Sequence, residues 1–325
     1  MFMVGVALPF SVASRRSKGQ SFAGMLLHAL YRSAALILLG VFLRSDSRQQ
    51  TYFTFEDVLT QIGLGYSVLF WLALARPKVQ WLAAFALLVG YWGLFAAYPT
   101  AASSLNTEEL GVPQDWPHRL SGFAAHWNKN TNPAADFDQW FLNLFPRQAP
   151  FRFNAGGYQT LNFIPSLATM IFGLLAGSLL QTKLPGFDKI RILACCGVAG
   201  LAAGVALNWL GVCPLVKRIW TPTWTIFSTG WACLFLAAFY WVIDLRGYRK
   251  WAFPLLVVGM NSIAMYCLEH LSVGFVSRTL KIHFGQPVFN VFGPAFAPLT
   301  EGIAVLLVLW LTLLWMHRRK IFLRI

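Results

Sequence analysis

Long apolar runs, separated by short polar or basic connections, occupy most of the chain. An α-helix rises about 1.5 Å per residue and needs roughly 20 apolar residues to cross a bilayer core, and most of these runs approach that length. We expect nine segments, at Met1–Ala13, Phe22–Phe42, Val58–Ala75, Val79–Tyr98, Thr160–Leu180, Ile190–Gly211, Thr223–Ile243, Trp251–Leu271 and Gly302–Met316. The first is short and is expected to be incomplete. The pattern predicts an all-α, polytopic membrane helix bundle.

Two stretches depart from this pattern. Residues 99–158 mix Trp, His, Asn, Asp and Pro, which predicts an ordered extracytoplasmic loop long enough to cap a pocket. Val273–Leu299 is rich in Phe, Gly and Pro, and a loop, a re-entrant segment and a further broken helix all fit it. The sequence shows no clear repeat, so we expect a single domain over residues 1–325.

The composition supports a membrane protein. Hydrophobic residues make up 57% of the chain and charged residues 12%, and the mean hydropathy is +0.56. Soluble domains carry about twice this share of charge. The net charge of +14 comes from Lys and Arg in short clusters between apolar runs, which is a topology signal. The lipid bilayer is therefore the expected partner, and nucleic acid is not.

Alternate connections carry most of the basic residues, and cytoplasmic connections are the ones enriched in Lys and Arg. The basic residues placed inside are Arg15, Arg16 and Lys18; Arg76 and Lys78; Lys183, Lys189 and Arg191; Arg246, Arg249 and Lys250; and Arg318, Arg319, Lys320 and Arg324. This predicts a cytoplasmic (inner) membrane protein with a cytoplasmic C-terminus. The chain would then start outside or within the membrane, which suggests that a helix precedes Met1.

Polar groups inside or beside the apolar runs are the candidates for chemistry, because burying them in lipid costs several kcal/mol unless they face a cavity or a partner. Arg32 lies about ten residues into its run, one helical turn after His28, and snorkelling is the alternative. Asn261 lies within a run, and His270 lies at the end of that run, where a solvated helix end is the alternative. His126 lies in the long loop, as a candidate base or as a histidine bonded within its loop.

Other signatures are absent or point to packing. The cysteines, Cys195, Cys196, Cys213, Cys233 and Cys267, have no metal-ligand or CxxC spacing, so we expect small packing residues and no metal. The pairs Gly173–Gly177 and Gly200–Gly204 have GxxxG spacing, which predicts close helix packing. The chain contains no Walker A loop, HExxH, GxSxG or GxGxxG motif.

Several stretches together point to one family. They are FMVGVALPFSVASRRSKG (2–19), RSAALILLGVFL (32–43), VLTQIGLGY (58–66), TLNFIPSLATMIFGLLAG (160–177), CPLVKRIWTPTWTIFSTGWA (213–232) and YWVIDLRGYRKWAFPLLVVGMNSIAMY (240–266). In their order and spacing they resemble the transmembrane acetyltransferases typified by heparan-α-glucosaminide N-acetyltransferase and its bacterial relatives. The likeness covers most of the chain.

The resemblance implies transfer of an acetyl group from cytoplasmic acetyl-CoA to an extracytoplasmic sugar or glycan. The polyanionic nucleotide of acetyl-CoA would bind the inside cations, for which the candidates are Arg15, Arg16, Lys18, Lys183 and Arg249. Attack on the thioester needs a base and donors for the developing oxyanion. Arg32 and Asn261 are candidate donors, and His126 and His270 are candidate bases.

The chain also departs from the family pattern. Relatives carry a first helix and a loop with the catalytic histidine before the segment that corresponds to Phe2, so the resemblance implies an N-terminally truncated chain without the family's base. Gln61 stands where relatives commonly carry Arg, which puts any acyl-donor role of that position in doubt.

The alternative functions are a transporter or lipid-linked glycan handler that uses the same cavity without chemistry, and a non-catalytic membrane partner. The acceptor, the acyl group and the oligomeric state, including a homo-oligomer, are left open by the sequence.

Overall fold

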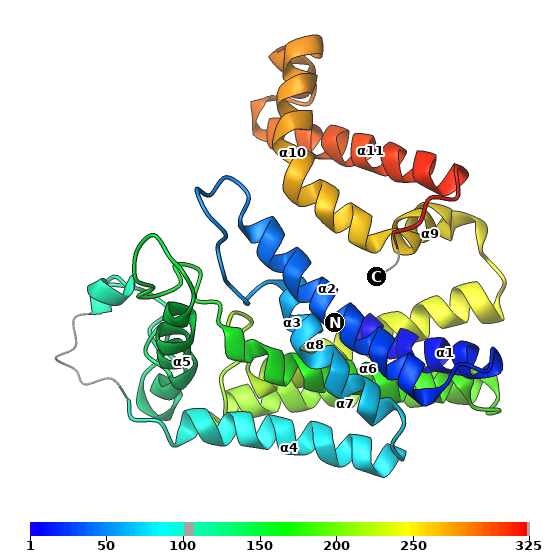
Figure 1. The fold of residues 1–325 in the computed structure, drawn as a ribbon, viewed down its shortest axis with the longest axis horizontal. Helices are drawn as coiled ribbons and strands as arrows, with labels where there is room; N and C mark the ends of the chain where they lie inside the picture. The colour runs from blue at the N-terminus through cyan, green and yellow to red at the C-terminus, as the bar shows by residue number, and fades with distance from the viewer. Residues whose placement is uncertain (101–106, 324–325) are drawn as a thin grey trace. The chain divides into compact units, whose positions relative to one another are not determined.

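The computed structural model describes residues 1–100 and 107–323, and the described chain is helical without a strand (Figure 1). It divides into two compact units, Met1–Trp241 and Val242–Ile325, and each is described here by itself. The all-α class predicted from the sequence is confirmed. The single domain over residues 1–325 stays a prediction, and Arg324 and residues 101–106 lie outside the described residues.

The first unit contains helices at each of the apolar runs expected within it. They are α1 (Phe2–Ser17), α2 (Phe22–Arg44), α3 (Val58–Ala73), α4 (Pro77–Ala96), α6 (Phe163–Gln181), α7 (Gly186–Trp209) and α8 (Pro222–Phe239). A further helix, α5 (Pro133–Phe141), lies in the long loop, where no helix was predicted. Side chains cap several of their starts: Asp57 accepts from Leu59 N at α3, and Thr221 accepts from Trp224 N at α8. Such caps satisfy backbone donors that a helix leaves unpaired at its first turn.

Helices α1 and α6 run parallel and touch backbone to backbone. A methyl group added to Gly173 would overlap the carbonyl oxygen of Phe2, and one added to Gly177 would overlap that of Val6. Gly5 meets the backbone of Met170 in the same way. Small residues allow this approach, which gains dispersion contacts where lipid offers no hydrophobic driving force. The close packing predicted for Gly173–Gly177 is confirmed.

The other helix pairs fix the direction of the bundle. Gly40 lies against Thr60 and Gly63 against Ile37, so α2 and α3 are antiparallel. Helices α7 and α8 are also antiparallel, with Gly200 against the backbone of Gly230. Gly204 packs on Phe227 in the same interface, which confirms the packing predicted for Gly200–Gly204.

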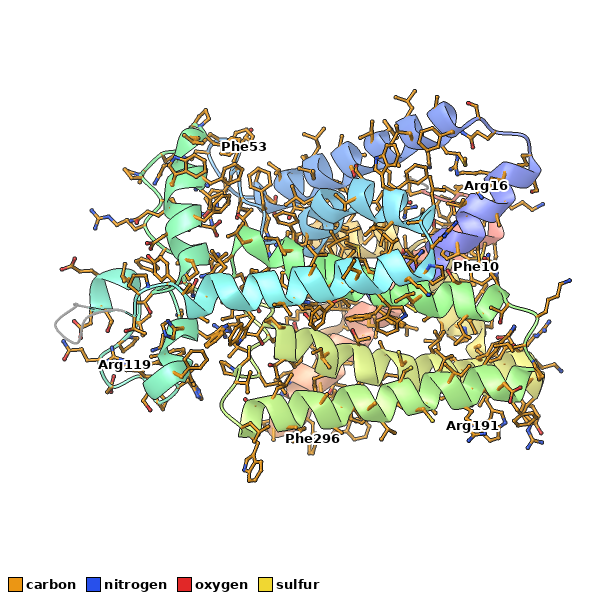
Figure 2. All side chains as sticks on the ribbon, turned by 90° about the horizontal axis from the view of Figure 1, so that it is seen from below. Phe10, Arg16, Phe53, Arg119, Arg191 and Phe296 are labelled. Atoms are coloured by element: carbon orange, nitrogen blue, oxygen red, sulfur yellow. The ribbon has the colours of Figure 1, made fainter. Side chains whose placement is uncertain are left out.

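These directions separate two ends of the first unit, which Figure 2 shows with Arg16 and Arg191 at one and Phe53 and Arg119 at the other. The first, called the basic end below, holds the connections 18–21, 74–76 and 182–185, together with the start of α7. The second holds the described part of the long loop, residues 107–158, called the roof below. The alternation of connections predicted from the sequence is thus present within this unit.

The second unit contains α9 (Phe253–Met260), α10 (Ser262–Phe284) and α11 (Ala297–Arg318). Its core joins Val257, Ala264 and Leu313, one from each helix. The short 3-10 helices Gln286–Asn290 and Pro294–Phe296 connect α10 to α11. The stretch Val273–Leu299 is therefore the end of α10, these two turns and the start of α11.

Within residues 1–100 and 107–323, six helices are long and apolar enough to cross a membrane, or up to seven if the bent pair α9–α10 is one span. Helix α3 is a shorter apolar helix, and α1 has 16 residues. The polytopic class fits, whereas the count of nine segments is not confirmed. One continuous helix over Trp251–Leu271 is wrong: the chain bends by 70° between α9 and α10, because Asn261 leaves the helical conformation with φ −130° and ψ 39°.

Candidate functional site

The roof is built from short helices and turns. Besides α5 it contains the 3-10 helices Thr107–Leu110, Gly122–Trp127 and Leu142–Leu144. Segments this short leave many backbone N–H and C=O groups outside regular structure, and each buried one needs a partner. In the described residues of this loop, side chains provide much of the bonding.

Three alternate asparagines in the stretch NKNTN supply those partners. Asn128 binds both backbone groups of Leu120, accepting from its N at 2.8 Å and donating to its O at 2.9 Å. Asn130 donates to Leu110 O at 2.8 Å and Asn154 O at 3.1 Å. Asn132 caps α5 by accepting from Ala134 N and Ala135 N, and donates to Asn128 O at 2.8 Å. Side-chain amides thus replace the ladder that a helix or sheet would provide.

An aromatic cluster packs the roof against the helix bundle. Trp127 is buried and stacks on Phe95 of α4, with ring centroids 6.3 Å apart. The same cluster includes Tyr91, Cys213 and Ile219, so it joins α4 to the connection between α7 and α8. Large buried aromatic rings contribute more stability per residue than any other contact in such a cluster.

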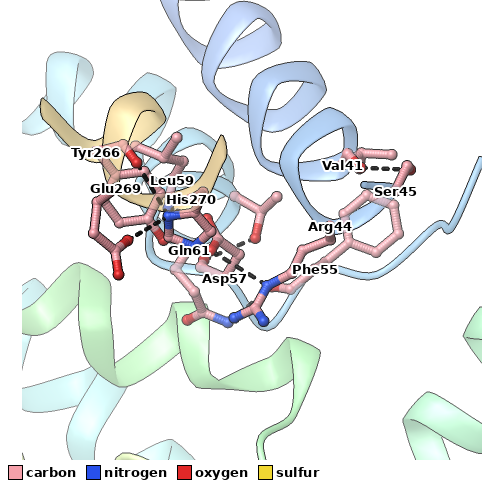
Figure 3. A network of polar contacts seen from close by, with 11 residues as sticks. Val41, Arg44, Ser45, Phe55, Asp57, Leu59, Gln61, Tyr266, Glu269 and His270 are labelled. Carbon is pink, nitrogen blue, oxygen red and sulfur yellow. Dashed lines mark hydrogen bonds and ion pairs between the residues drawn. The ribbon is translucent and has the colours of Figure 1, made fainter. Parts of the chain in front are cut away.

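A polar anchor ties the segment that follows the roof to α3. Gln61 is buried, and its Nε2 lies 3.0 Å from Phe55 O and 3.2 Å from both Gln159 O and Thr160 O. Figure 3 shows Gln61 beside the capping residue Asp57, which forms an ion pair with Arg44 at 3.5 Å. The Gln61 amide therefore joins the α2–α3 connection to the segment that follows the roof, which is a structural role for this residue.

A buried carboxyl group, that of Asp138, and a half-buried one, that of Glu56, lie close to this anchor. Asp138 of α5 accepts from Thr160 N at 3.0 and 3.2 Å through its two oxygens. Burial raises the pKa of Asp138 to about 7, with the neighbouring Glu56 carboxyl adding to the rise. Burial also raises the pKa of Glu56. The join between roof and bundle thus contains one acid, Asp138, whose pKa lies near neutral pH.

A pocket of about 400 Å³ lies between the roof and the α7–α8 connection. The roof contributes Trp116, His118, Arg119, Trp127 and Lys129 to its lining, and the connection contributes Val216, Arg218 and Ile219. This volume is within the range of small-molecule sites, which are apolar with a few placed polar groups. We call it the roof pocket.

The roof pocket has cationic and aromatic walls. The Lys129 ammonium lies 5.6 Å from the ring centroid of Trp116, and the Arg218 guanidinium lies 5.9 Å from that of Tyr158. Burial, and then the nearby Arg218 charge, lower the pKa of Lys129. Such a site suits a ligand with an apolar face and negative charge or hydroxyl groups.

The basic end carries most of the expected cofactor-binding cations. Arg16, Lys18 and Lys183 are exposed there, since α1 and α6 are parallel and both end at this face. Arg15 is half-buried and donates to Gln20 Oε1 at 3.0 Å. The structure brings these four to one end of the first unit. Arg249 belongs to the second unit, where its Nε lies 3.5 Å from Ile243 O.

Arg32 and His126 lie apart from the roof pocket. Arg32 of α2 stacks over the Tyr66 ring at 4.8 Å and donates to its hydroxyl at 3.4 Å. Its Nε is buried with no partner among the described residues. His126 is half-buried, with Nδ1 2.7 Å from Tyr98 O, so the loop-internal bond given as its alternative is present. Tyr98 in turn donates to Asp136, and burial raises the pKa of Tyr98 to about 12.

Asn261 and His270 lie in the second unit. Asn261 is fully buried at the break between α9 and α10, where it donates to Ile321 O at 3.0 Å and accepts from Leu323 N at 3.1 Å. This amide holds the segment after α11 and is satisfied by it. His270 Nδ1 lies 2.7 Å from Glu269 Oε2, and the ring centroids of His270 and Tyr266 are 4.4 Å apart. Figure 3 draws these three side chains.

The cysteines contribute packing in part. Cys213 and Cys233 are buried as expected, whereas Cys195 and Cys196 of α7 are exposed. Among the residues that the structure describes, no group of three or more His, Cys, Asp or Glu side chains is arranged to hold a metal ion.

Sequence reasoning did not single out the residues of the roof pocket as a group. Arg119, Lys129 and Arg218 are not among the candidate residues that the sequence suggested. Trp116, close to His118 and Arg119, was the feature of the sequence that could have indicated this site. Arg218 follows about one hundred residues later, so its contribution to the pocket depends on the fold. No protein-family model and no curated protein matches the chain.

Proposed function

We propose that the chain is a membrane acyltransferase that moves an acetyl group from acetyl-CoA at the basic end to a sugar acceptor held in the roof pocket. The observation that carries the proposal is the difference between the two ends of the first unit: exposed cations on short connections at one, and an aromatic, cationic pocket under a roof at the other. The resemblance described above supports the same reaction. The excess of Lys and Arg on short connections favours a cytoplasmic basic end.

The proposed reaction uses each end differently. Arg15, Arg16, Lys18 and Lys183 bind the phosphates of acetyl-CoA by charge-assisted hydrogen bonds. The pantetheine arm passes between the helices, where the guanidinium of Arg32 offers an unpartnered donor. The acceptor amine or hydroxyl attacks the carbonyl carbon, its new bond to the acetyl group forms, and the C–S bond breaks. The acceptor proton passes to a base, and coenzyme A leaves as a thiolate that takes up a proton.

His118 is the histidine in the lining of the roof pocket, and in this proposal it is the base that takes the proton from the acceptor. Imidazole is the side chain that most often has this role, and removing such a base lowers turnover by about 100-fold or more. His126 is held by Tyr98 O and is not in that lining, so it serves as the matched comparison.

The test measures release of the coenzyme A thiol by the protein in lipid nanodiscs, with acetyl-CoA and glucosamine supplied. The chain and His126→Gln are expected to release thiol at similar rates, and His118→Gln is expected to be slower by about 100-fold. Thiol release no faster than from empty nanodiscs would exclude the proposed reaction. Equal loss in both variants would exclude the role of His118.

A second candidate is a transporter of the same class of ligand. The observation that favours it is the 70° bend between α9 and α10, because broken helices commonly form transporter binding sites. Uptake of labelled glucosamine into sealed vesicles without acetyl-CoA would support transport. Uptake that requires acetyl-CoA and yields the acetylated sugar would support the acyltransferase.

A further inference from the structure

The roof pocket collects positive charge without a balancing carboxylate in its lining. Arg119, Lys129 and Arg218 all line it, and none of the lining residues is Asp or Glu. Lys129 is half-buried, and Arg218 is near enough to disfavour its charged form. Arg119 and Arg218 are exposed, so water weakens the repulsion among these like charges, and a bound anion would remove what remains of it.

Two of these cations have hydrogen-bond donors to spare. Arg218 donates from Nη1 to Gly156 O at 2.6 Å, and the other N–H groups of its guanidinium have no protein partner in the described chain. Lys129 Nζ has only a long contact of 3.4 Å, to Gly111 O. Both residues flank the turn at Gly157, since the Lys129 stem packs on that glycine. They therefore present several donors to one side of the pocket.

A lining residue, Trp127, also carries a donor that is unpaired among the described residues. Trp127 is 2% exposed, and its indole Nε1 is buried with no hydrogen-bond partner in the described part of the chain. An indole N–H can only donate, and leaving one unpaired costs about 1–3 kcal/mol. This unpaired N–H belongs to a residue of the lining and is independent of the surface cations.

We infer that the roof pocket binds a phosphate group, carried by the acceptor. A phosphate ester has a charge of about −1.5 to −2 and three acceptor oxygens, which matches several cations better than a single carboxylate does. The ring of Trp116 provides an apolar face for the attached sugar, and about 400 Å³ has room for a sugar phosphate. The identity of the acceptor rests on the proposed function, but the binding of phosphate can be measured without it.

The test measures binding to the protein in phosphatidylcholine nanodiscs, without acetyl-CoA, by equilibrium dialysis of labelled glucose 1-phosphate and of labelled glucose. The chain is expected to bind glucose 1-phosphate at least about tenfold more tightly than glucose, and inorganic phosphate is expected to compete. Lys129→Gln and Arg218→Gln are each expected to weaken binding by about tenfold. Nanodiscs that also contain polyprenyl phosphate distinguish the source of the phosphate group. If this lipid competes with glucose 1-phosphate, the ligand is a lipid-linked phosphate; if it does not compete, the ligand is a soluble one.

Lys217→Gln is the matched control, because Lys217 is exposed beside Arg218 and is not in the lining of the pocket. Arg218→Lys keeps the charge and is expected to retain part of the affinity, which separates binding from misfolding. Equal affinity for glucose and glucose 1-phosphate, or equal losses in Lys217→Gln and Arg218→Gln, would overturn the inference. Phosphate binding without thiol release would exclude acyl transfer and support the anion site. Thiol release without phosphate binding would support acyl transfer and exclude the anion site.

Discussion

The interface between α1 and α6 and the roof of the same unit are held together in opposite ways. At the interface, Gly5, Gly173 and Gly177 remove side chains so that two backbones touch. In the roof, Asn128 and Asn132 add side-chain hydrogen bonds where the backbone has no regular partner. The α1–α6 interface has no room for an added side-chain atom. The roof, in contrast, depends on side-chain amides that cannot be removed without losing hydrogen bonds. Stability in this unit therefore depends on sterics in the bundle and on amide chemistry in the roof.

The largest effect is expected from adding one methyl group to the interface. Gly173→Ala places a Cβ against the carbonyl oxygen of Phe2, a backbone atom that cannot move aside without separating α1 from α6. We expect a loss of about 3 kcal/mol, at the upper end for overpacking. Denaturation in dodecyl sulfate, followed by circular dichroism, measures it.

The control for this change is Gly90→Ala in α4, where an added Cβ has nothing within 4 Å. Alanine is the better helix former, so this variant should be neutral or more stable by up to about 1 kcal/mol. Equal destabilisation by both variants would show that the close approach of α1 to α6 does not stabilise the bundle.

A smaller effect is expected from removing one amide of the roof. Asn132→Ala removes the cap of α5 and the bond to Asn128 O, which should cost about 1–2 kcal/mol. Because these bonds are local, faster hydrogen exchange should be confined to the roof and should not reach α6. The matched change is Ser121→Ala, at an N-cap whose side chain makes no capping bond. Similar exchange in both variants would contradict the role given to the asparagines.

The smallest effect is a change in the pH dependence of the roof. The pKa of Asp138 rises from 3.8 to about 7 through burial. The folded roof therefore favours the protonated form, so this group's contribution to stability is present below about pH 4 and is lost as the pH rises to 7. Glu56 and Arg147 are the charged neighbours that tune it.

Asp138→Asn keeps an acceptor for Thr160 N without the charge. Melting temperatures measured from pH 4 to 8 should fall less in this variant than in the unchanged chain. Parallel pH profiles would show that Asp138 does not titrate in this range.

The sequence predicted the bundle better than the site, and the reason lies in what each depends on. Apolar runs located α2, α4, α6, α7 and α8 within a few residues, because lipid imposes a minimum length and excludes charge. Spacing also predicted the packing of Gly173 and Gly177. The roof pocket depends on Arg218 meeting Lys129 and Trp116 across the fold, and no local pattern contains that information.

The break in the second unit was missed for a related reason. Residues 251–271 are apolar enough for one span, and the sequence does not show that Asn261 is satisfied by the backbone of Ile321 and Leu323. Tertiary partners of a polar side chain decided the conformation there. The role of Gln61 also depends on distant partners, because its amide bonds to the backbone of Gln159 and Thr160, about one hundred residues later in the chain.

The central claim is that the two ends of the first unit serve one reaction from opposite sides of a membrane. Sealed vesicles of known orientation test it most directly, with acetyl-labelled acetyl-CoA on one side and glucosamine on the other. The account predicts labelled product only when acetyl-CoA faces the basic end and the sugar faces the roof. Product that forms only when both compounds are on the same side, or no product in either orientation, would contradict it.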